Sequence, residues 1–335
     1  YGKTPASGTG ENCLNDWADC PLITGIKRQV GNAVKGWLDT GKRTAVAGSV
    51  DDMVMTYVPT WYMRAEADDT KIDVAFSKTQ LDSNWKDYAG SVGTERIGHF
   101  RLGCYACKSD FKSYSGEPED SKDIKSFISG CQALGTGFDI MTWYQWNYLA
   151  ALATLLYKST DLQNTLAGGA VAGSHGVNEK ALSYANDFGM SGTIGYETQN
   201  QMAFFWIQNL WGNCGYFVGG AKTDSLYRLM TSLGYSSAED ADFELKELSP
   251  ALPTSMRYGV TNVVGSNEAG FFPTRVGGSI TTYFSDYCDI EKECVCVAGG
   301  GPGDFDGYAG PFCISFDYST TSKSPYITSR LSYRL

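Results

Sequence analysis

The sequence contains very little histidine and comparatively few charged residues. His99 and His175 are the only two histidines among 335 residues, and charged residues make up 19% of the chain, whereas about 25% is usual in soluble domains. A histidine-rich zinc site is therefore excluded. Any Ser–His–Asp or Cys–His catalytic centre would need one of these two histidines. Because His99 falls in an expected strand and His175 in a Gly/Ser loop, we assign neither a catalytic role.

Positive charge and long apolar runs are also scarce. The chain has 27 Lys and Arg residues against 37 Asp and Glu residues, which gives a net charge of −10, so nucleic acid is not an expected partner. No uncharged apolar run approaches the roughly 18 residues of a spanning helix, because Thr154 interrupts the longest candidate, at 148–156. We therefore expect no direct membrane insertion. The sequence begins at Tyr1 without a leader-like segment, so we expect any signal or anchor to lie upstream.

The cysteines and the familiar short motifs do not indicate a cofactor. Ten cysteines are present, but no second pair repeats the spacing of Cys104 and Cys107, as a four-ligand zinc site requires. We expect that pair to be packing residues or a local disulfide, and most other cysteines to be buried free thiols. Residues 36–43 (GWLDTGKR) nearly match a phosphate-binding loop, but Arg43 replaces the required Ser or Thr. We predict no metal, no cofactor and no catalytic residues.

Hydrophobic periodicity predicts an α+β architecture. Apolar residues at three- and four-residue spacing predict helices at 21–38, 121–134 and 142–157, the last two being core helices. Alternating or β-branched runs predict strands at 54–64, 98–107, 294–298, 312–318 and 327–333. From about residue 165 the pattern changes to short runs separated by glycine clusters, which indicates small twisted sheets with long loops. We expect residues 1–50 to form an arm and a helix, and residues 51–335 to form one domain.

Several ordered segments resemble known protein families. IQNLWGNCGYFVGG at 207–220 resembles a signature of the C-type-lectin-like domain of the formylglycine-generating-enzyme type, in which Trp and Asn tie the core sheet to a loop. MVMTYVPTWYMRAE at 53–66 and the segment from GTGFDIMTWYQWN to STDLQN at 135–164 resemble parts of phage tail proteins. GYAGPFCISFDYS and SRLSYRL, within 297–335, resemble the ends of phage tail receptor-binding proteins and of the variable proteins of diversity-generating retroelements.

This resemblance implies a C-type-lectin-like fold that displays a diversifiable ligand-binding surface at about 278–335. It implies host attachment by binding a cell-surface protein or glycan, with an upstream tail or anchor module as a further partner and oligomers possible. The implied location is a virion tail or a bacterial cell surface. The catalytic cysteines of the enzyme have no counterpart here, so we expect no enzyme activity. Two alternatives remain open: a tail enzyme that acts on surface polysaccharide, and a purely structural tail or pilus subunit.

The composition near the C-terminus independently favours binding. Asp, Phe, Tyr, Ser and Thr supply 15 of the 24 residues at 303–326, as in a paratope, where Tyr gives rigid contact area and Ser gives adaptable hydrogen bonds. Strand alternation predicts that Phe312, Ile314, Phe316, Ile327 and Leu331 point into the core. The predicted ligand-binding residues are Asp304, Phe305, Asp306, Tyr308, Tyr318, Ser319, Thr320, Ser322, Ser324 and Tyr326. A second predicted patch consists of Tyr283, Asp286 and Tyr287.

Overall fold

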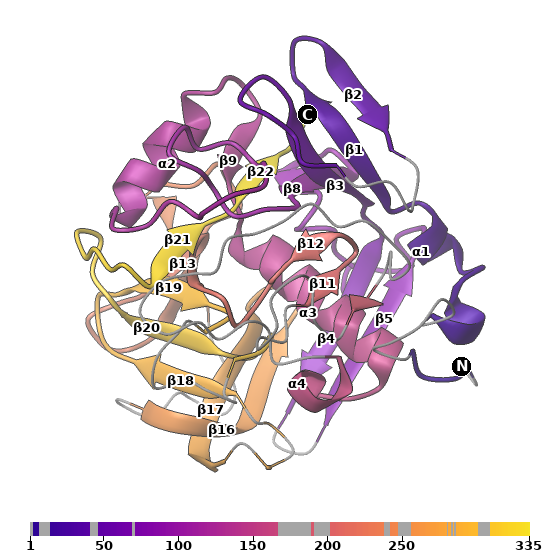
Figure 1. The fold of residues 1–335 in the computed structure, drawn as a ribbon. Coiled ribbons are helices and arrows are strands. Elements are labelled where there is room, and N and C mark those ends of the chain that lie inside the picture. Colours follow the sequence, from indigo (N-terminus) through magenta and orange to yellow (C-terminus); the bar gives the residue numbers. More distant parts are fainter. Residues whose placement is uncertain are drawn as a thin grey trace.

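The structure is a computed structural model in which strands predominate (Figure 1). It describes residues 3–6, 14–40, 46–68, 71–166, 189–190, 202–237, 242–246, 256–279, 281–282, 284, 286–300 and 309–335. The helical segments in these ranges are η1 (Asn15–Trp17), α1 (Pro21–Thr24), α2 (Ile124–Gln132), α3 (Trp143–Tyr157) and α4 (Leu162–Thr165). None of these helices is long and apolar enough to cross a membrane.

A six-stranded antiparallel sheet joins the beginning of the chain to its end. Its order is β2 (Gly36–Asp39), β1 (Lys27–Asn32), β3 (Met53–Pro59), β8 (His99–Gly103), β22 (Leu331–Tyr333) and β9 (Phe138–Ile140). Strand β1 pairs with β3, so the predicted division at residue 50 runs through one sheet. The N-terminal hairpin and the C-terminal strand lie on the same side of the molecule in Figure 1.

A larger sheet of eleven strands carries most of the C-terminal half. Its main order is β15 (Glu244–Leu245), β14 (Leu229–Thr231), β13 (Gly215–Thr223), β19 (Val295–Ala298), β20 (Ile314–Tyr318), β18 (Tyr287–Ile290), β16 (Met256–Ser266), β4 (Tyr62–Ala67) and β5 (Ile72–Ser77). Strand β17 (Gly270–Gly278) pairs with β16, and β21 (Ile327–Ser329) pairs with β13. The β18–β20 and β13–β21 pairs are parallel.

Two small sheets complete the strand inventory of the described ranges. One consists of β6 (Ser91–Val92) and β7 (Glu95–Arg96), and the other of β10 (Gly189–Met190), β11 (Ala203–Phe204) and β12 (Ile207–Gln208). The chain is thus mostly β with few helices, and the predicted α+β class is not confirmed. The eleven-stranded and six-stranded sheets are larger than the small twisted sheets that the sequence predicted, and the eleven-stranded sheet includes two parallel pairs.

Helix α3 runs through the centre of the molecule and is buried on nearly every side. Thr142 caps it in a reciprocal capping box with Gln145, which satisfies backbone groups that a buried helix start would otherwise leave unpaired. Trp143 Nε1 donates to the carbonyl of Ala269 at 2.7 Å, and Trp146 Nε1 donates to that of Pro311 at 2.9 Å. The helix therefore holds the large sheet and the C-terminal segment in fixed positions.

Helix α2 confirms the second predicted core helix with a shorter span. Asp123, and not the predicted start at residue 121, is its N-cap and accepts from Ser126 N at 2.8 Å. Its apolar side packs Phe127 against Phe217 of β13, with ring centroids 6.2 Å apart. The helix therefore covers part of the large sheet's outer face.

The predicted helix at 21–38 is wrong. The structure has only the short α1 there, followed by the β1–β2 hairpin, in which Val30 pairs with Leu38. Gly31 and Gly36 have positive φ values of 146° and 88°, which favour a strand–turn–strand path over a continuous helix. The apolar spacing at three and four residues coincides here with two antiparallel strands.

Another predicted element differs in detail. The predicted strand at 54–64 is two strands, β3 and β4, in different sheets, and the chain passes between them at residues 60–61. No disulfide joins the nine cysteines within the described ranges, and seven of them are buried. The pair Cys104 and Cys107 is therefore part of the core packing, and Cys13 lies outside the described residues.

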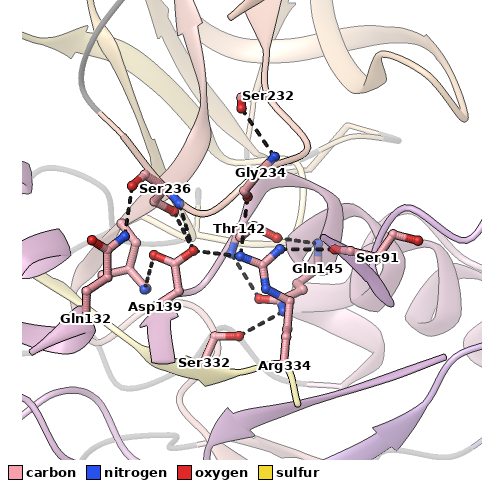
Figure 2. Close-up of polar contacts among 11 residues, drawn as sticks. Ser91, Gln132, Asp139, Thr142, Gln145, Ser232, Gly234, Ser236, Ser332 and Arg334 are labelled. Atoms are coloured by element: carbon pink, nitrogen blue, oxygen red, sulfur yellow. Dashed lines mark hydrogen bonds and ion pairs between the residues drawn. The ribbon is translucent and has the colours of Figure 1, made fainter. Parts of the chain in front are cut away.

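The end of the chain is anchored by a buried arginine (Figure 2). Arg334, directly after β22, places Nη2 2.7 Å from Asp139 Oδ2 on β9, and its Nη1 donates to the Ser91 carbonyl at 3.2 Å. Ser236 donates to the same Asp139 oxygen through its backbone N at 2.8 Å and its Oγ at 3.1 Å. Three distant segments are thereby tied to the C-terminal strand, which fixes the scaffold beneath the C-terminal loops.

Candidate functional site

The predicted binding residues at 318–326 lie at the end of β20 and on the loop that leads to β21. Tyr326 is 39% exposed, and Ser319 is also exposed. Tyr318, Thr320, Ser322 and Ser324 are half-buried. This loop is therefore accessible at the surface, as predicted for a display loop.

The serines of this loop have a local structural role. Ser322 N donates to the Ser319 carbonyl at 3.1 Å, and Ser319 N donates to Ser322 Oγ at 3.0 Å. Ser324 Oγ accepts from Tyr326 N at 3.1 Å. Such side-chain to backbone bonds are typical of serine in turns. The serines shape the loop, and the two tyrosines supply its large side chains.

Five predicted residues fall outside the described part of the chain. These residues are Asp304, Phe305, Asp306, Tyr308 and Tyr283.

Asp286 does not face outward, contrary to the prediction. Its side chain is buried, where Oδ1 accepts from Gln163 Nε2 at 2.8 Å and Oδ2 accepts from Phe312 N at 2.9 Å. Burial raises the pKa of Asp286 to about 7. Asp286 therefore ties α4 to the start of the β20 segment from inside the protein. Its neighbour Tyr287 is only 9% exposed but borders the outer surface described next.

Three predicted tyrosines surround one hollow on the outer face of the large sheet. We call this feature the tyrosine hollow, and it has a volume of about 70 Å³. It is lined by Gly215, Tyr287, Val297, Gly300, Cys313, Ser315, Asp317, Tyr318, Tyr326 and Ile327. Tyr287, Tyr318 and Tyr326 come from β18, β20 and the loop before β21. The pairing of non-adjacent strands brings them together.

Strand register explains which side chains reach this hollow. Ser315 of β20 lies between Asp289 of β18 and Val297 of β19. Successive residues of a strand point to opposite faces, so Ser315 lines the hollow while Ile314 and Phe316 enter the core. The register of β20 against β19 shifts between the Val297–Ser315 and Val295–Tyr318 pairs, and beyond this irregularity both Asp317 and Tyr318 line the hollow. The predicted inward positions Phe312, Ile314, Phe316, Ile327 and Leu331 are all buried, which confirms that part of the prediction.

Negative charge gathers beside the tyrosines. Asp317 Oδ1 accepts from Ser315 Oγ at 2.5 Å. Asp289 lies 3.1 Å from Arg257 Nε, which also donates to Tyr287 Oη at 3.0 Å. Burial and the nearby Asp317 carboxylate raise the pKa of Asp289 to about 6, even though Arg257 opposes this shift. Burial, followed by Asp317, also raises the pKa of Tyr318 to about 12.

Sequence reasoning omitted Asp317, Ser315, Asp289 and Arg257 from the site. The alternation that assigns Phe316 to the core also places Ser315 and Asp317 on the opposite face, so these two could have been included. Arg257 carries no such signal, because it lies on β16 and reaches the site only through the β16–β18 pairing. Its position is a consequence of the tertiary fold.

Neither histidine of the chain is placed at this hollow by the described residues. His99 lies on β8 of the six-stranded sheet, where its ring centroid is 5.1 Å from that of Tyr57, and His175 lies outside the described ranges. In the same part of the chain, no group of three or more His, Cys, Asp or Glu side chains could hold a metal ion. The described chemistry of the hollow is that of aromatic rings, hydroxyls and carboxylates.

Comparisons with known proteins identify similarity to a solved structure but to no family model. No protein-family model matches the sequence, and no curated protein matches it. Among solved structures, the chain is similar to one described as "Major Tropism Determinant U1 Variant", with 9% sequence identity and a TM-score of 0.34. The similarity covers 89% of this chain and 85% of that one.

Proposed function

We propose that this chain is a receptor-binding protein with a C-type-lectin-like fold, which attaches a phage tail or a bacterial surface structure to a host cell. The tyrosine hollow and the loop at 319–326 form the proposed contact surface. The sequence segments that resemble tail receptor-binding proteins and retroelement variable proteins support this proposal. We further propose that the protein binds without catalytic turnover.

One observation carries the proposal. Tyr287, Tyr318 and Tyr326 converge from separate elements around one hollow, while the opposite face of the same strands is packed core. Tyrosine is enriched where binding energy concentrates, because it offers a large rigid surface with a polar tip. A sheet that merely supported the fold would have no need of three tyrosines around an open hollow. The rigid core behind them keeps their positions fixed before binding, which lowers the entropy cost of association.

The experiment measures attachment of the fluorescently labelled chain to a panel of bacterial strains by flow cytometry. We expect labelling of at least one strain, and we expect Tyr318→Ala and Tyr326→Ala each to weaken it at least tenfold, which corresponds to about 1.4 kcal/mol or more. Tyr62→Ala on β4, at the other end of the same sheet, is the matched control and should attach normally. Equal labelling by all four proteins would contradict the proposal.

A separate measurement addresses turnover. The unlabelled chain is incubated with capsule and cell-wall glycans from the labelled strains, and soluble products are followed by chromatography. We expect no product release. Products that accumulate with time would instead support the alternative of a tail enzyme acting on polysaccharide.

A further inference from the structure

We propose that the tyrosine hollow recognises a positively charged side chain, a lysine ammonium or an arginine guanidinium, on a host surface protein. Asp317 is the proposed anionic contact, and Tyr318 and Tyr326 are the proposed aromatic contacts. This inference rests on the proposed function and names the chemistry of the ligand that the same surface binds.

Asp317 is the carboxylate of the hollow that has no ion pair within the described residues. It is exposed, and its Oδ1 accepts from Ser315 Oγ. The neighbouring cations have other partners: Arg257 pairs with Asp289, and Lys323 Nζ lies 3.9 Å from Asp123 Oδ2. Arg257 acts on Asp317 only at longer range. A cation from a partner would therefore meet a carboxylate that no described lysine or arginine neutralises.

The negative charge of Asp317 raises the pKa values of several groups around the hollow. After burial, Asp317 is the largest cause that raises the pKa values of Asp289 and Tyr318. Asp317 is also the largest cause after burial that raises the pKa of Cys294, to about 11. The Asp317 carboxylate thus lies close enough to β18 and to the start of β19 to give this surface a negative potential. Such a potential favours a cation and opposes a phosphate or a carboxylate as ligand.

The aromatic rings add a second reason for a cation. A lysine or arginine group over a tyrosine face is attracted by the negative face of the ring, and more strongly when water is excluded. Tyr318 is held in place by an edge-to-face contact with Phe217, at 6.4 Å between ring centroids and an interplanar angle of 87°. Tyr326 lines the same hollow and is 39% exposed, so its ring is accessible to an incoming group. The hollow thus combines aromatic faces with a carboxylate.

The hollow is large enough for the end of a side chain. Its volume is about 70 Å³, which is on the order of five water-sized positions at about 10–15 Å³ each. The charge of Asp317 and the aromatic faces favour a cation over a neutral sugar. We therefore favour a protein side chain over a glycan as the occupant, and the glycoside probes below test this choice.

The test uses small probes and the whole 335-residue chain. N-acetyl-arginine amide and N-acetyl-lysine amide are titrated by ligand-observed NMR against the neutral N-acetyl-citrulline amide and the methyl glycosides of glucose, galactose and mannose. We expect the two cationic probes to bind at least about tenfold more tightly than citrulline amide, as a charge-assisted contact implies. Equal binding of citrulline amide would overturn the proposal, and so would glycosides that bind while the cations do not.

Matched variants separate a local contact from the net charge of the protein. Asp317→Asn and Glu95→Gln each remove one negative charge, and Glu95 lies exposed on β7, in a different sheet. Asp317→Asn should weaken cationic-probe binding about tenfold, whereas Glu95→Gln should leave it unchanged. Equal losses in both variants would overturn the proposal in favour of long-range attraction. Circular dichroism melting checks that both variants fold.

A second pair of variants tests the aromatic contact independently of Asp317. Tyr326→Phe keeps a ring face and should retain cationic-probe binding, while Tyr326→Leu keeps apolar area without a ring and should weaken it severalfold. Equal binding by both variants would overturn the assigned role of the ring.

The cell assay makes failure of the inference distinguishable from failure of the proposed function. If Tyr326→Ala abolishes attachment to cells while Asp317→Asn attaches normally, the receptor-binding function stands and the cationic ligand is wrong. If the cationic probes bind but no strain is labelled, the ligand chemistry stands and the host-attachment function is wrong.

Discussion

Arg334 and Asp139 form an ion pair in which both side chains are buried, with 2.7 Å between Nη2 and Oδ2. The pair joins the last strand of the chain to β9, directly before the central helix α3. The same Asp139 oxygen accepts two hydrogen bonds from Ser236. Figure 2 shows these groups converging from separate segments. The C-terminal region that carries the proposed binding surface is therefore fixed to the core at its far end.

Removing one partner of this pair should strongly destabilise the protein. Arg334→Met leaves the Asp139 carboxylate buried without its counter-charge, so we expect the free energy of unfolding to fall by about 3–5 kcal/mol. Chemical denaturation followed by tryptophan fluorescence measures this loss. The control is Lys27→Met, which breaks an exposed pair with Asp39 and should have a much smaller effect. Similar losses in the two variants would contradict the structural role of the buried pair.

The burial of Asp286 should make stability depend on pH. Its pKa is about 7 in the folded protein against 3.8 for the ordinary side chain, so the folded state binds the proton more tightly. Its contribution to stability is therefore fully present below about pH 4 and is lost as the pH rises through about 7. The loss has an upper limit of about 4 kcal/mol. Urea unfolding between pH 4 and pH 8 measures the trend.

Asp286→Asn is the control for that pH dependence. The asparagine carbonyl can accept from Phe312 N, and its amide can donate to Gln163 after the glutamine side chain flips. We expect the variant to fold and to lose most of the decline in stability between about pH 4 and pH 7. An unchanged pH profile would assign the decline to other groups.

Phe316 should matter for stability and not for binding. Its ring stacks on Phe272 at 5.4 Å and meets Trp143 edge-on at 6.2 Å between centroids. Phe316→Ala empties this buried site, and we expect a loss of about 3–5 kcal/mol. Tyr326→Ala, at an exposed position, should change stability little. Thermal melting of the two variants compares them, and a destabilised Tyr326→Ala would show that the loop is part of the scaffold.

Binding of the cationic probe should itself depend on pH. Asp289 has a pKa of about 6, and burial also raises the pKa of Asp317. Protonation of Asp289 removes one negative charge beside the hollow, and the raised pKa of Asp317 acts in the same direction, so affinity should fall as the pH decreases through about 6. NMR titrations of N-acetyl-arginine amide at pH 5 and pH 7.5 measure the difference. Equal affinity at the two values would contradict a carboxylate contact.

Local patterns were sufficient for α3 and β20. The apolar spacing at 142–157 predicted α3, and the alternation at 312–318 predicted which side chains of β20 enter the core. A strand repeats its faces with a short period, so burial of one face of β20 appears directly in the sequence. Helix α3 is buried on nearly every side, so its apolar residues match the helical spacing without marking a single face. The same rule failed at 21–38, where β1 pairs with β3 through hydrogen bonds that no local window contains.

The acidic balance, the scarcity of histidine, the two core helices and the tyrosine-rich composition near the C-terminus follow from local sequence. Which of those residues meet depends on the tertiary fold. Parallel pairing of β18 with β20 brings Tyr287 and Tyr318 to one hollow, and pairing of β13 with β21 brings Tyr326 to the same hollow. The tertiary fold also buries Asp286, although its neighbour in the sequence, Tyr287, borders the hollow. Composition specifies which groups are available, but long-range strand pairing sets their register and therefore the face on which each group lies.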